Sequence, residues 1–411
     1  MAIGCAGPAP SGPTYFYSLF VTVCIYIDAS NNRHLGTNMR LTHWLRGGAT
    51  LAAIFAMVGA AHGQILIGQT VGITGSAAAT VAESMQGAAL YIDHINARGG
   101  IAGQKVEVIS LDDKFDPKLT LENARVLIEE KGVIGLFMTR GTPHTQGIMP
   151  LLEQHGVPLV GPSTGAMVLH QPVHRFIFNV RAPYQREVEK AITHLNTLGI
   201  KRIGVVHVDD SFGADGLAGA QLGFKANQLE ALFVEKFDRA KPDYSAIAPR
   251  VAQKQPQAVV FIGTGAAVVD GIKALRAAGV TGQIVTLSNN ASGGFVKLLG
   301  DQARGVVVTQ VFPSERSVNY PVVKEAMELA RAKNISDLTP AMVEGFVSAK
   351  VLLEGIKRAG PKPDRAKLHA GLESIKKWDL GGVELSYSPT DHSGLVFADL
   401  SIIGSDGRFK R

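Results

Sequence analysis

The chain of 411 residues carries 41 lysines and arginines against 35 aspartates and glutamates, a formal charge of +6, with 46% hydrophobic and only 18% charged residues. This composition is that of one large or two ordinary globular domains, and it excludes a disordered or fibrous chain. The basic residues are spread beside acidic ones on expected helix faces and never form a run of five, which argues against nucleic acid as a ligand.

The N-terminal 63 residues differ from the rest of the chain. From Met39, two arginines precede an apolar run over 49–60, and small residues precede Gln64. This is the pattern of a secretory signal peptide with its cleavage site. The apolar run is too short to span about 30 Å of hydrocarbon at about 1.5 Å per residue. We therefore expect a signal peptide over 39–63 and a mature periplasmic chain that begins near Gln64.

Residues 1–38 do not fit this scheme, because no basic residue precedes their own apolar stretch over 15–27. We interpret them as a non-native extension from an over-called start codon, with Met39 as the initiator. Both cysteines, Cys5 and Cys24, lie in this extension. A mature chain from Gln64 has no cysteine, so its exported fold depends on core burial and not on disulfides.

From Gln64 onward, short β-branched runs alternate with helical patterns. Strands are expected over 65–71, 106–111, 133–138 and 157–160, and helices over 85–96, 117–130 and 143–155. A regular alternation of strand and helix predicts a parallel, doubly wound sheet.

A second series of the same kind follows. Helices are expected over 185–198, 213–227, 244–254 and 266–278, and strands over 203–208, 232–237, 258–262, 284–287 and 306–311. Helices over 320–332, 340–359 and 365–376 and a tail strand over 395–403 complete the chain. The sequence thus predicts an α/β fold of two doubly wound lobes, with crossings at 179–183 and 312–314. Lobe 1 is assigned to 64–181 and 313–387, and lobe 2 to 182–312 and 388–411.

The loops that follow strands are the informative ones, since open α/β sheets bind ligands at the carboxyl ends of their strands. In Gly141, Thr142 and Pro143, a strand ends, a hydroxyl follows, and proline takes the expected first helical position. Free N–H groups and the Thr142 hydroxyl make an anion site at such a helix start. The run from Gly161 to Gly165 repeats the arrangement one strand over, so two helix starts are expected to share one carboxylate. Alternatively, Thr142 and Ser163 are plain N-caps worth about 1 kcal/mol each.

Enzymatic interpretations fit less well. The G-x-S-x-G pattern at 161–165, with Asp391 and His392 downstream, suggests a hydrolase, but Pro172 interrupts the helix that a nucleophile elbow requires. The glycines at 263–265 lack the third glycine of a dinucleotide fingerprint. His170 and His174 have metal-like spacing, yet Pro172 lies between them. We expect no catalytic residue, no cofactor and no metal.

Several motifs resemble the type I periplasmic solute-binding proteins of the leucine/isoleucine/valine-binding family, which serve ABC importers. They are IGQTVGITGS at 67–76, MQGAALYIDHINARGGIAGQKVEVISLDDKFDP at 85–117, GVPLVGPSTG at 156–165 and RIGVVHVDDSFGADGL at 202–217. The Gly-Thr-Pro triplet at 141–143 is typical of a less-studied branch. The resemblance covers essentially the whole chain after the signal peptide. It implies two lobes joined by a three-crossing hinge, with the ligand held in the cleft by closure of the lobes.

The resemblance also implies site residues. Thr142 matches the hydroxyl that binds the ligand's carboxylate, the neighbouring loop supplies backbone and hydroxyl contacts, and Phe212 lies where a tyrosine often lines the far lobe. The full expected ligand-binding set is Ser76, Gly141, Thr142, Ser163, Thr164, Gly165, Asp210, Phe212, Ser288 and Asn289.

Two positions depart from the amino-acid binders. The glutamate that faces the ligand's ammonium falls on Ser288, followed by Asn289, and a second lining tyrosine falls near Gly265. Burying an ammonium without a carboxylate partner costs several kcal/mol. Leucine is therefore disfavoured as the ligand unless Asp209 or Asp210 substitutes for the missing glutamate.

Taken with the residues, the resemblance implies an exported, monomeric, non-enzymatic protein. It would capture a small carboxylate, whether amino acid-like, keto, hydroxy or aromatic, and present it to the membrane permease of an ABC importer. A ligand-sensing subunit that hands its closed state to a signalling or regulatory partner is the alternative.

Overall fold

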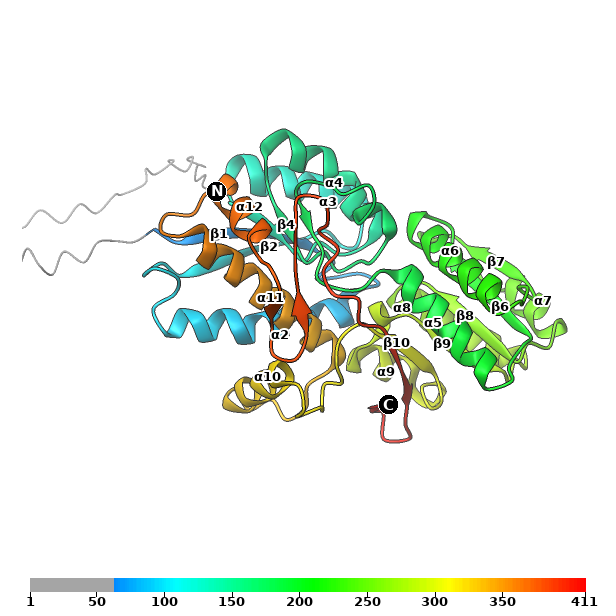
Figure 1. The fold of residues 1–411 in the computed structure, drawn as a ribbon. Helices are drawn as coiled ribbons and strands as arrows, with labels where there is room; N and C mark the ends of the chain where they lie inside the picture. The colour runs from blue at the N-terminus through cyan, green and yellow to red at the C-terminus, as the bar shows by residue number, and fades with distance from the viewer. Residues whose placement is uncertain (1–62) are drawn as a thin grey trace, which may run out of the picture. The chain divides into compact units, whose positions relative to one another are not determined.

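The computed structural model describes residues 63–411, so the expected extension and nearly all of the expected signal peptide lie outside the described residues. Residues 63–411 form two mainly parallel sheets with helices on both faces (Figure 1). The prediction of an α/β fold with two doubly wound sheets is confirmed.

The first sheet has five strands, all parallel, in the order β2-β1-β3-β4-β5. Its side chains alternate between two cores, since Ile65 and Ile67 of β1 pack on one face and Leu66 on the other. The strands are β1 (Ile65–Val71), β2 (Val106–Asp112), β3 (Gly135–Phe137), β4 (Leu159–Val160) and β5 (Ile177–Phe178).

Helices α2 and α11 cover one face of this sheet, and α3 and α4 cover the other (Figure 1). We call this sheet and its helices lobe 1. The helices are α2 (Ala78–Ala97), α3 (Pro117–Arg125) with the π-helical turn η1 (Val126–Glu130), α4 (Thr142–His155), the 3-10 turn η2 (Met167–Leu169), α10 (Pro321–Ala332), α11 (Pro340–Ala359) and α12 (Arg365–Glu373). A small two-stranded sheet, β11 (Trp378–Asp379) and β12 (Glu384–Leu385), packs with them.

The second sheet has seven strands in the order β14-β13-β10-β9-β8-β6-β7, and only β13 and β14 run antiparallel to their neighbours. We call this sheet and its helices lobe 2. The strands are β6 (Ile203–Val208), β7 (Val234–Phe237), β8 (Ala258–Ile262), β9 (Gln283–Thr286), β10 (Val307–Gln310), β13 (Asp399–Ile403) and β14 (Phe409–Lys410).

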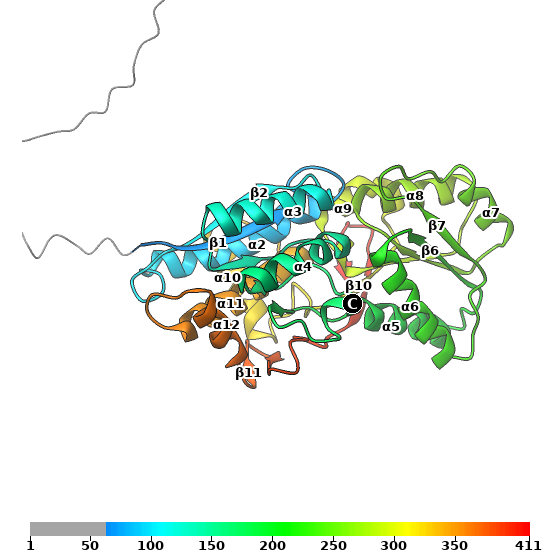
Figure 2. The ribbon, with the colours of Figure 1, turned by 90° about the horizontal axis from the view of Figure 1, so that it is seen from above.

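Helices α5 and α6 lie on one face of the second sheet, and α7 and α8 on the other (Figure 2). The helices are α5 (Tyr184–Thr197), α6 (Ser211–Ala226), α7 (Ile247–Gln253), α8 (Gly265–Ala277) and α9 (Gly293–Leu299), with the 3-10 turns η3 (Ser288–Asn290) and η4 (Gly300–Gln302).

The chain passes between the two sheets three times: after β5, after β10 and before β13. The crossing after β5 contains the segment 179–183, and the one after β10 begins at 311. The residue boundaries expected for the two lobes stay a prediction.

Some expected elements start or end elsewhere. Helix α2 begins at Ala78, whereas the sequence predicted a start at residue 85. The earlier start was missed because Thr80 and Ser84, in the first turns, are polar although they are buried, so the sequence shows no apolar face there. Helix α9 was not predicted, since it opens with two glycines, which are poor helix formers. Of the two-residue strands, β4 lies within the strand expected over 157–160, whereas β5, β11, β12 and β14 were not predicted, because two residues are too few to show an alternation of side chains. Within residues 63–411, no helix combines the length and the apolarity that a bilayer crossing demands.

Candidate functional site

Two loops at the carboxyl ends of neighbouring parallel strands lie where lobe 1 meets lobe 2: the β3 loop (139–142) and the β4 loop (161–166). The β3 loop leads directly into α4, with Pro143 in the first helical turn. Gly141 has a φ of 97°, and a Cβ there would lie 2.4 Å from Nδ1 of His144. Glycine is therefore required for this turn.

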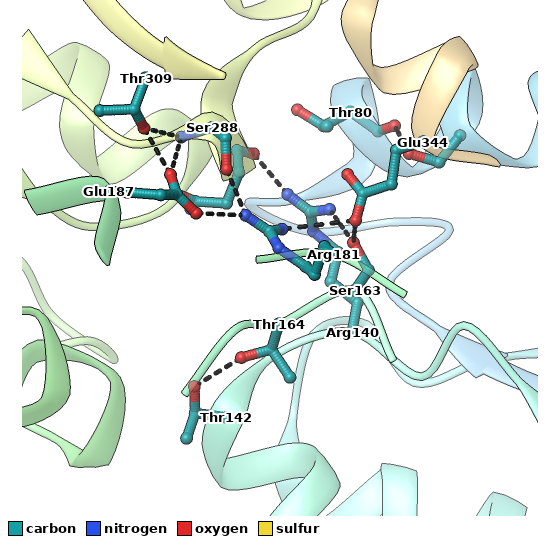
Figure 3. Close-up of polar contacts among 12 residues, drawn as sticks. Thr80, Arg140, Thr142, Ser163, Thr164, Arg181, Glu187, Ser288, Thr309 and Glu344 are labelled. Atoms are coloured by element: carbon teal, nitrogen blue, oxygen red, sulfur yellow. Dashed lines mark hydrogen bonds and ion pairs between the residues drawn. The ribbon is translucent and has the colours of Figure 1, made fainter. Parts of the chain in front are cut away.

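A buried pair of hydroxyl groups joins the two loops. Oγ1 of Thr142 lies 2.8 Å from Oγ1 of Thr164, and neither residue is more than 1% exposed (Figure 3). The N-cap of α4 is Gly141, with no side-chain capping bond, so the interpretation of Thr142 as a plain N-cap is wrong. One mutual hydrogen bond uses only one of the two hydroxyl protons, so the pair keeps a donor for a third group.

The β4 loop does not start a long helix, which corrects the expectation of two adjacent helix starts. Only the three-residue turn η2 follows it. Tertiary contacts hold the loop instead: the N–H of Tyr184 donates to the carbonyl of Gly165 at 2.7 Å, and the N–H of Ser163 donates to the carbonyl of Thr139 at 2.9 Å. A Cβ at Gly165 would lie 2.6 Å from the carbonyl oxygen of Ala182.

Beside these loops lies a buried charged network that the sequence analysis missed. It consists of Arg140, Arg181, Glu187 and Glu344, none more than 4% exposed (Figure 3). Arg181 lies in the crossing after β5. Its guanidinium pairs with Glu187 of α5 at 2.8 Å and with Glu344 of α11 at 3.3 Å, and it donates to the Ser288 hydroxyl. It also lies 4.7 Å from the centre of the Tyr184 ring.

Arg140 is the second guanidinium of this network. It donates to the hydroxyl of Ser163 at 2.9 Å, and that hydroxyl donates to Glu344 at 3.0 Å. Its other terminal nitrogen donates to the backbone carbonyl of Asn289, in lobe 2, at 2.5 Å. Burial lowers the pKa of Arg140, but a guanidinium stays charged in proteins. Two arginines and two glutamates make the network formally neutral.

On the lobe 2 side, Ser288 and Asn289 follow β9. The N–H of Ser288 donates to Glu187 at 3.1 Å and to the hydroxyl of Thr309 at 2.8 Å. The carboxamide of Asn289 donates to the carbonyl of Gly263, while its Oδ1 is buried and has no hydrogen-bond partner. The Phe212 ring is buried and packs on Tyr184 with centroids 4.8 Å apart.

The two aspartates that were candidates for an ammonium partner are engaged elsewhere. Asp209 is exposed and pairs with Lys236 at 2.9 Å. Asp210 caps α6, accepting from the N–H groups of Phe212 at 2.9 Å and Gly213 at 3.1 Å, and pairs with Arg239. A carboxylate does lie beside Ser288, that of Glu187, but Arg181 holds it.

Ser76 is exposed, and its carbonyl accepts the N–H of Ala266 from lobe 2 at 3.2 Å. A Cβ at Gly265 would lie 1.8 Å from that carbonyl. Gly265, where a lining tyrosine was expected from the resemblance, thus permits close approach of the two lobes and leaves no room for a side chain.

The structure therefore brings Thr142, Thr164, Ser163 and Gly165 together on the two loops. Ser288 bonds to Arg181 and Asn289 bonds to Arg140, whereas Asp210 is paired with Arg239. A sequence signal for the missed network exists: Arg140, Arg181 and Glu344 each interrupt an apolar or strand-end segment. In contrast, the Ser163 hydroxyl is occupied by Arg140 and Glu344, and the His392 ring stacks on Phe178, so the hydrolase triad does not assemble. In the described part of the chain, no three metal-ligating side chains gather into a metal site.

Comparisons with known proteins agree with this fold. A family model described as "Periplasmic binding protein" matches residues 64–398. The Leu/Ile/Val-binding protein homolog 3 of Brucella melitensis is 26% identical over 84% of this chain and 93% of that protein. A substrate-binding periplasmic protein from Ralstonia solanacearum, solved by crystallography, is 31% identical with a TM-score of 0.78, over 84% of this chain and 99% of that one. A branched-chain amino acid transporter substrate-binding protein from Streptococcus pneumoniae, solved with isoleucine, shares the fold at 20% identity and a TM-score of 0.74, over 85% of this chain and 98% of that one.

Proposed function

The chain belongs to the periplasmic binding protein family, a non-enzymatic family of ligand-binding proteins, and from this premise we propose that it captures a small carboxylate between its two lobes for an ABC importer. The observation that carries the proposal is the hydroxyl pair formed by Thr142, at the start of α4, and Thr164 of the β4 loop.

A carboxylate fits this position for three physical reasons. The first turn of α4 has N–H groups without intrahelical acceptors, and the helix dipole favours negative charge there. The hydroxyl pair has a proton left to donate. Finally, hydrogen bonds to a charged acceptor are about twice as strong as neutral ones.

The side chains around the proposed carboxylate site favour simple carboxylates over zwitterions as ligands. The buried network is already neutral, and Asp209 and Asp210 are paired with Lys236 and Arg239. No carboxylate of this group is left for a ligand's ammonium. Phe212 offers an apolar face, and Asn289 Oδ1 offers an acceptor that suits a hydroxyl. We therefore expect keto, hydroxy or aromatic acids to bind more tightly than amino acids of matching side chain, including those that relatives bind.

The partner follows from the same proposal. An exported chain with a closing cleft presents its ligand to a membrane permease, and the signal-peptide pattern over 39–63 supports a periplasmic location. In this proposal the closed protein delivers its ligand to the permease for transport. In the alternative, the protein is a ligand-sensing subunit whose closed state is recognised by a regulatory partner.

A thermal-shift screen of the secreted protein, followed by titration calorimetry, tests the ligand class. A ligand that binds only the folded state raises stability by about 2.7 kcal/mol at 100 times its Kd. The screen uses 2-keto acids, benzoate-like acids and leucine. Submicromolar leucine binding, tighter than that of the matching 2-keto acid, would contradict the preference for simple carboxylates.

The substitution Thr142→Ala tests the carboxylate site itself. We expect a loss of affinity of about 1.5–3 kcal/mol for the best ligand of the screen, because a hydrogen bond to a charged group is removed. Stability should also fall, by about 1–3 kcal/mol, because the buried Thr164 hydroxyl loses its partner. Thr142→Ser keeps the hydroxyl and should stay close to wild type in calorimetry. Unchanged affinity in the alanine variant, with a clear loss of stability, would show that the pair is only structural.

A further inference from the structure

The β3 and β4 loops carry two sets of side chains that make different contacts. Thr142 and Thr164 bond to each other, whereas Arg140 and Ser163 bond to Glu344 and to lobe 2 (Figure 3). We propose that Arg140 is a positioning residue that holds lobe 1 against lobe 2 in the closed arrangement, separately from the threonine pair. This inference rests on the proposed function, since it concerns closure of the same two lobes.

Groups of lobe 1 direct the Arg140 guanidinium toward lobe 2. One terminal nitrogen is fixed by the Ser163 hydroxyl, which is itself held by Glu344, and the other reaches the carbonyl of Asn289. Arg140 is 3% exposed, so its charge is desolvated where it lies. A buried charge is costly unless its hydrogen bonds are made. Separation of the lobes removes the Asn289 acceptor, and closure restores it.

Closure also places several backbone N–H groups of one lobe against acceptors of the other. In lobe 2, Ala266 donates to the carbonyl of Ser76 at 3.2 Å, and Gly293 and Gly294 donate to the Glu83 carboxylate at 3.1 and 2.8 Å. In lobe 1, Met167 donates to Asp215 at 3.0 Å. Separation of the lobes breaks these bonds, so hydrogen exchange at these amides reports opening of the lobes without a ligand.

The test is hydrogen exchange, resolved to single amides, on the ligand-free full chain and on Arg140→Met. We expect exchange at Ala266, Gly293, Gly294 and Met167 to accelerate about tenfold, because a charged hydrogen bond that favours the closed state is lost. Amides inside β6 and β8 should keep their wild-type rates. Wild-type rates at the four cross-lobe amides in a folded Arg140→Met protein would overturn the proposal.

Arg276→Met is the matched control. The Arg276 guanidinium is also partly buried, but it donates to the carbonyls of Val280 and Gly282 and so stays within lobe 2. This variant should leave the four amides unchanged. An equal acceleration in Arg276→Met would mean general loosening and would overturn the assignment to Arg140.

Arg140→Lys keeps the test decisive where the methionine variant does not fold. An ammonium preserves the charge but not the forked geometry that serves Ser163 and Asn289 together, so a smaller acceleration is expected. Wild-type rates in the lysine variant would again overturn the proposal. Because no ligand is present, these outcomes are independent of the calorimetry on Thr142→Ala, which tests the proposed function.

Discussion

The β3 loop, together with Pro143 that follows it, and the β4 loop contain the same kinds of residue, a glycine, a proline and hydroxyl side chains, yet they are positioned by different means. Gly141 and Pro143 start α4, so local backbone chemistry places Thr142. Thr164 is positioned by tertiary contacts of its loop: the β4 loop bonds to Tyr184 at the start of α5, to α11 through Ser163, and to the β3 loop. Similar motifs on neighbouring strands thus depend on helix-start chemistry in one case and on tertiary contacts in the other.

The largest expected effect comes from Glu344→Gln, which removes the charge that anchors the β4 loop. Glu344 pairs with Arg181 and accepts from Ser163. Breaking a buried pair from one side costs about 3–5 kcal/mol of unfolding free energy, because it leaves an uncompensated charge. Urea denaturation measures the loss.

Glu354→Gln is the control on the same helix, since Glu354 pairs with Arg358 near the surface at 2.7 Å. Its expected cost is below about 1 kcal/mol. Equal losses in the two variants would mean that charge does not anchor the β4 loop and would remove the contrast between the loops.

On the side of the β3 loop, His144 gives a dependence on pH. It is fully buried in the first turn of α4, stacks on Phe115 with centroids 4.4 Å apart, and has no partner for either ring nitrogen. Burial lowers the pKa of His144 from 6.5 to about 4. Between those values the unfolded chain binds more protons, so the unfolding free energy falls as pH decreases from about 6.5 to about 4. At about 1.4 kcal/mol per pKa unit, the loss is of the order of 2–3 kcal/mol.

His144→Phe keeps a ring against Phe115 and removes the titration. Urea denaturation at several pH values should show a shallower acid loss in the variant than in wild type. His170, whose pKa burial also lowers to about 4, remains in both proteins, so the difference between the two curves isolates His144. Parallel curves would contradict the expectation.

The smallest effects are expected from two glycine substitutions, one at Gly165 of the β4 loop and one at Gly147 of α4, the helix that follows the β3 loop. Gly165→Ala places a Cβ against the Ala182 carbonyl and should destabilise the protein by about 1–3 kcal/mol. Gly147→Ala lies on the exposed face of α4 with no atom nearby, and should stabilise by about 0.5–1 kcal/mol. Thermal unfolding of both variants checks the signs. Two changes of the same sign would contradict the difference in positioning.

Long periodic elements were predictable from the sequence. The bounds expected for β1, β6, β8 and α11 agree with the structure, because period and composition favour one structure throughout each segment. The start of α4 was also predictable within a residue, since glycine and proline fix the backbone locally. The helix-start pattern singled out Thr142 and the run from Gly161 to Gly165, and the family resemblance added Thr142 and Thr164 as ligand contacts. Their roles in ligand binding stay predictions.

The β4 loop and the charged network were not predictable in the same way. Gly-Pro-Ser-Thr-Gly contains helix-start residues, but contacts with Tyr184 and Glu344 decide its conformation. Ser163 and Glu344 are 181 positions apart, and Arg181 and Ser288 are 107 apart. No local pattern can pair such residues, because the topology alone brings them together.

Helix α11 has a consequence for the order in which the protein can fold. It packs on α2, and its Val343, Phe346 and Val347 share one core with Ile65 and Ile67 of β1. These partners come from opposite ends of the described chain, and contacts of such separation form late because a long loop must close first. A ribosome must therefore finish most of the polypeptide before the core of lobe 1 can close. Until α11 has been synthesised, the nascent chain carries a first lobe whose core is incomplete.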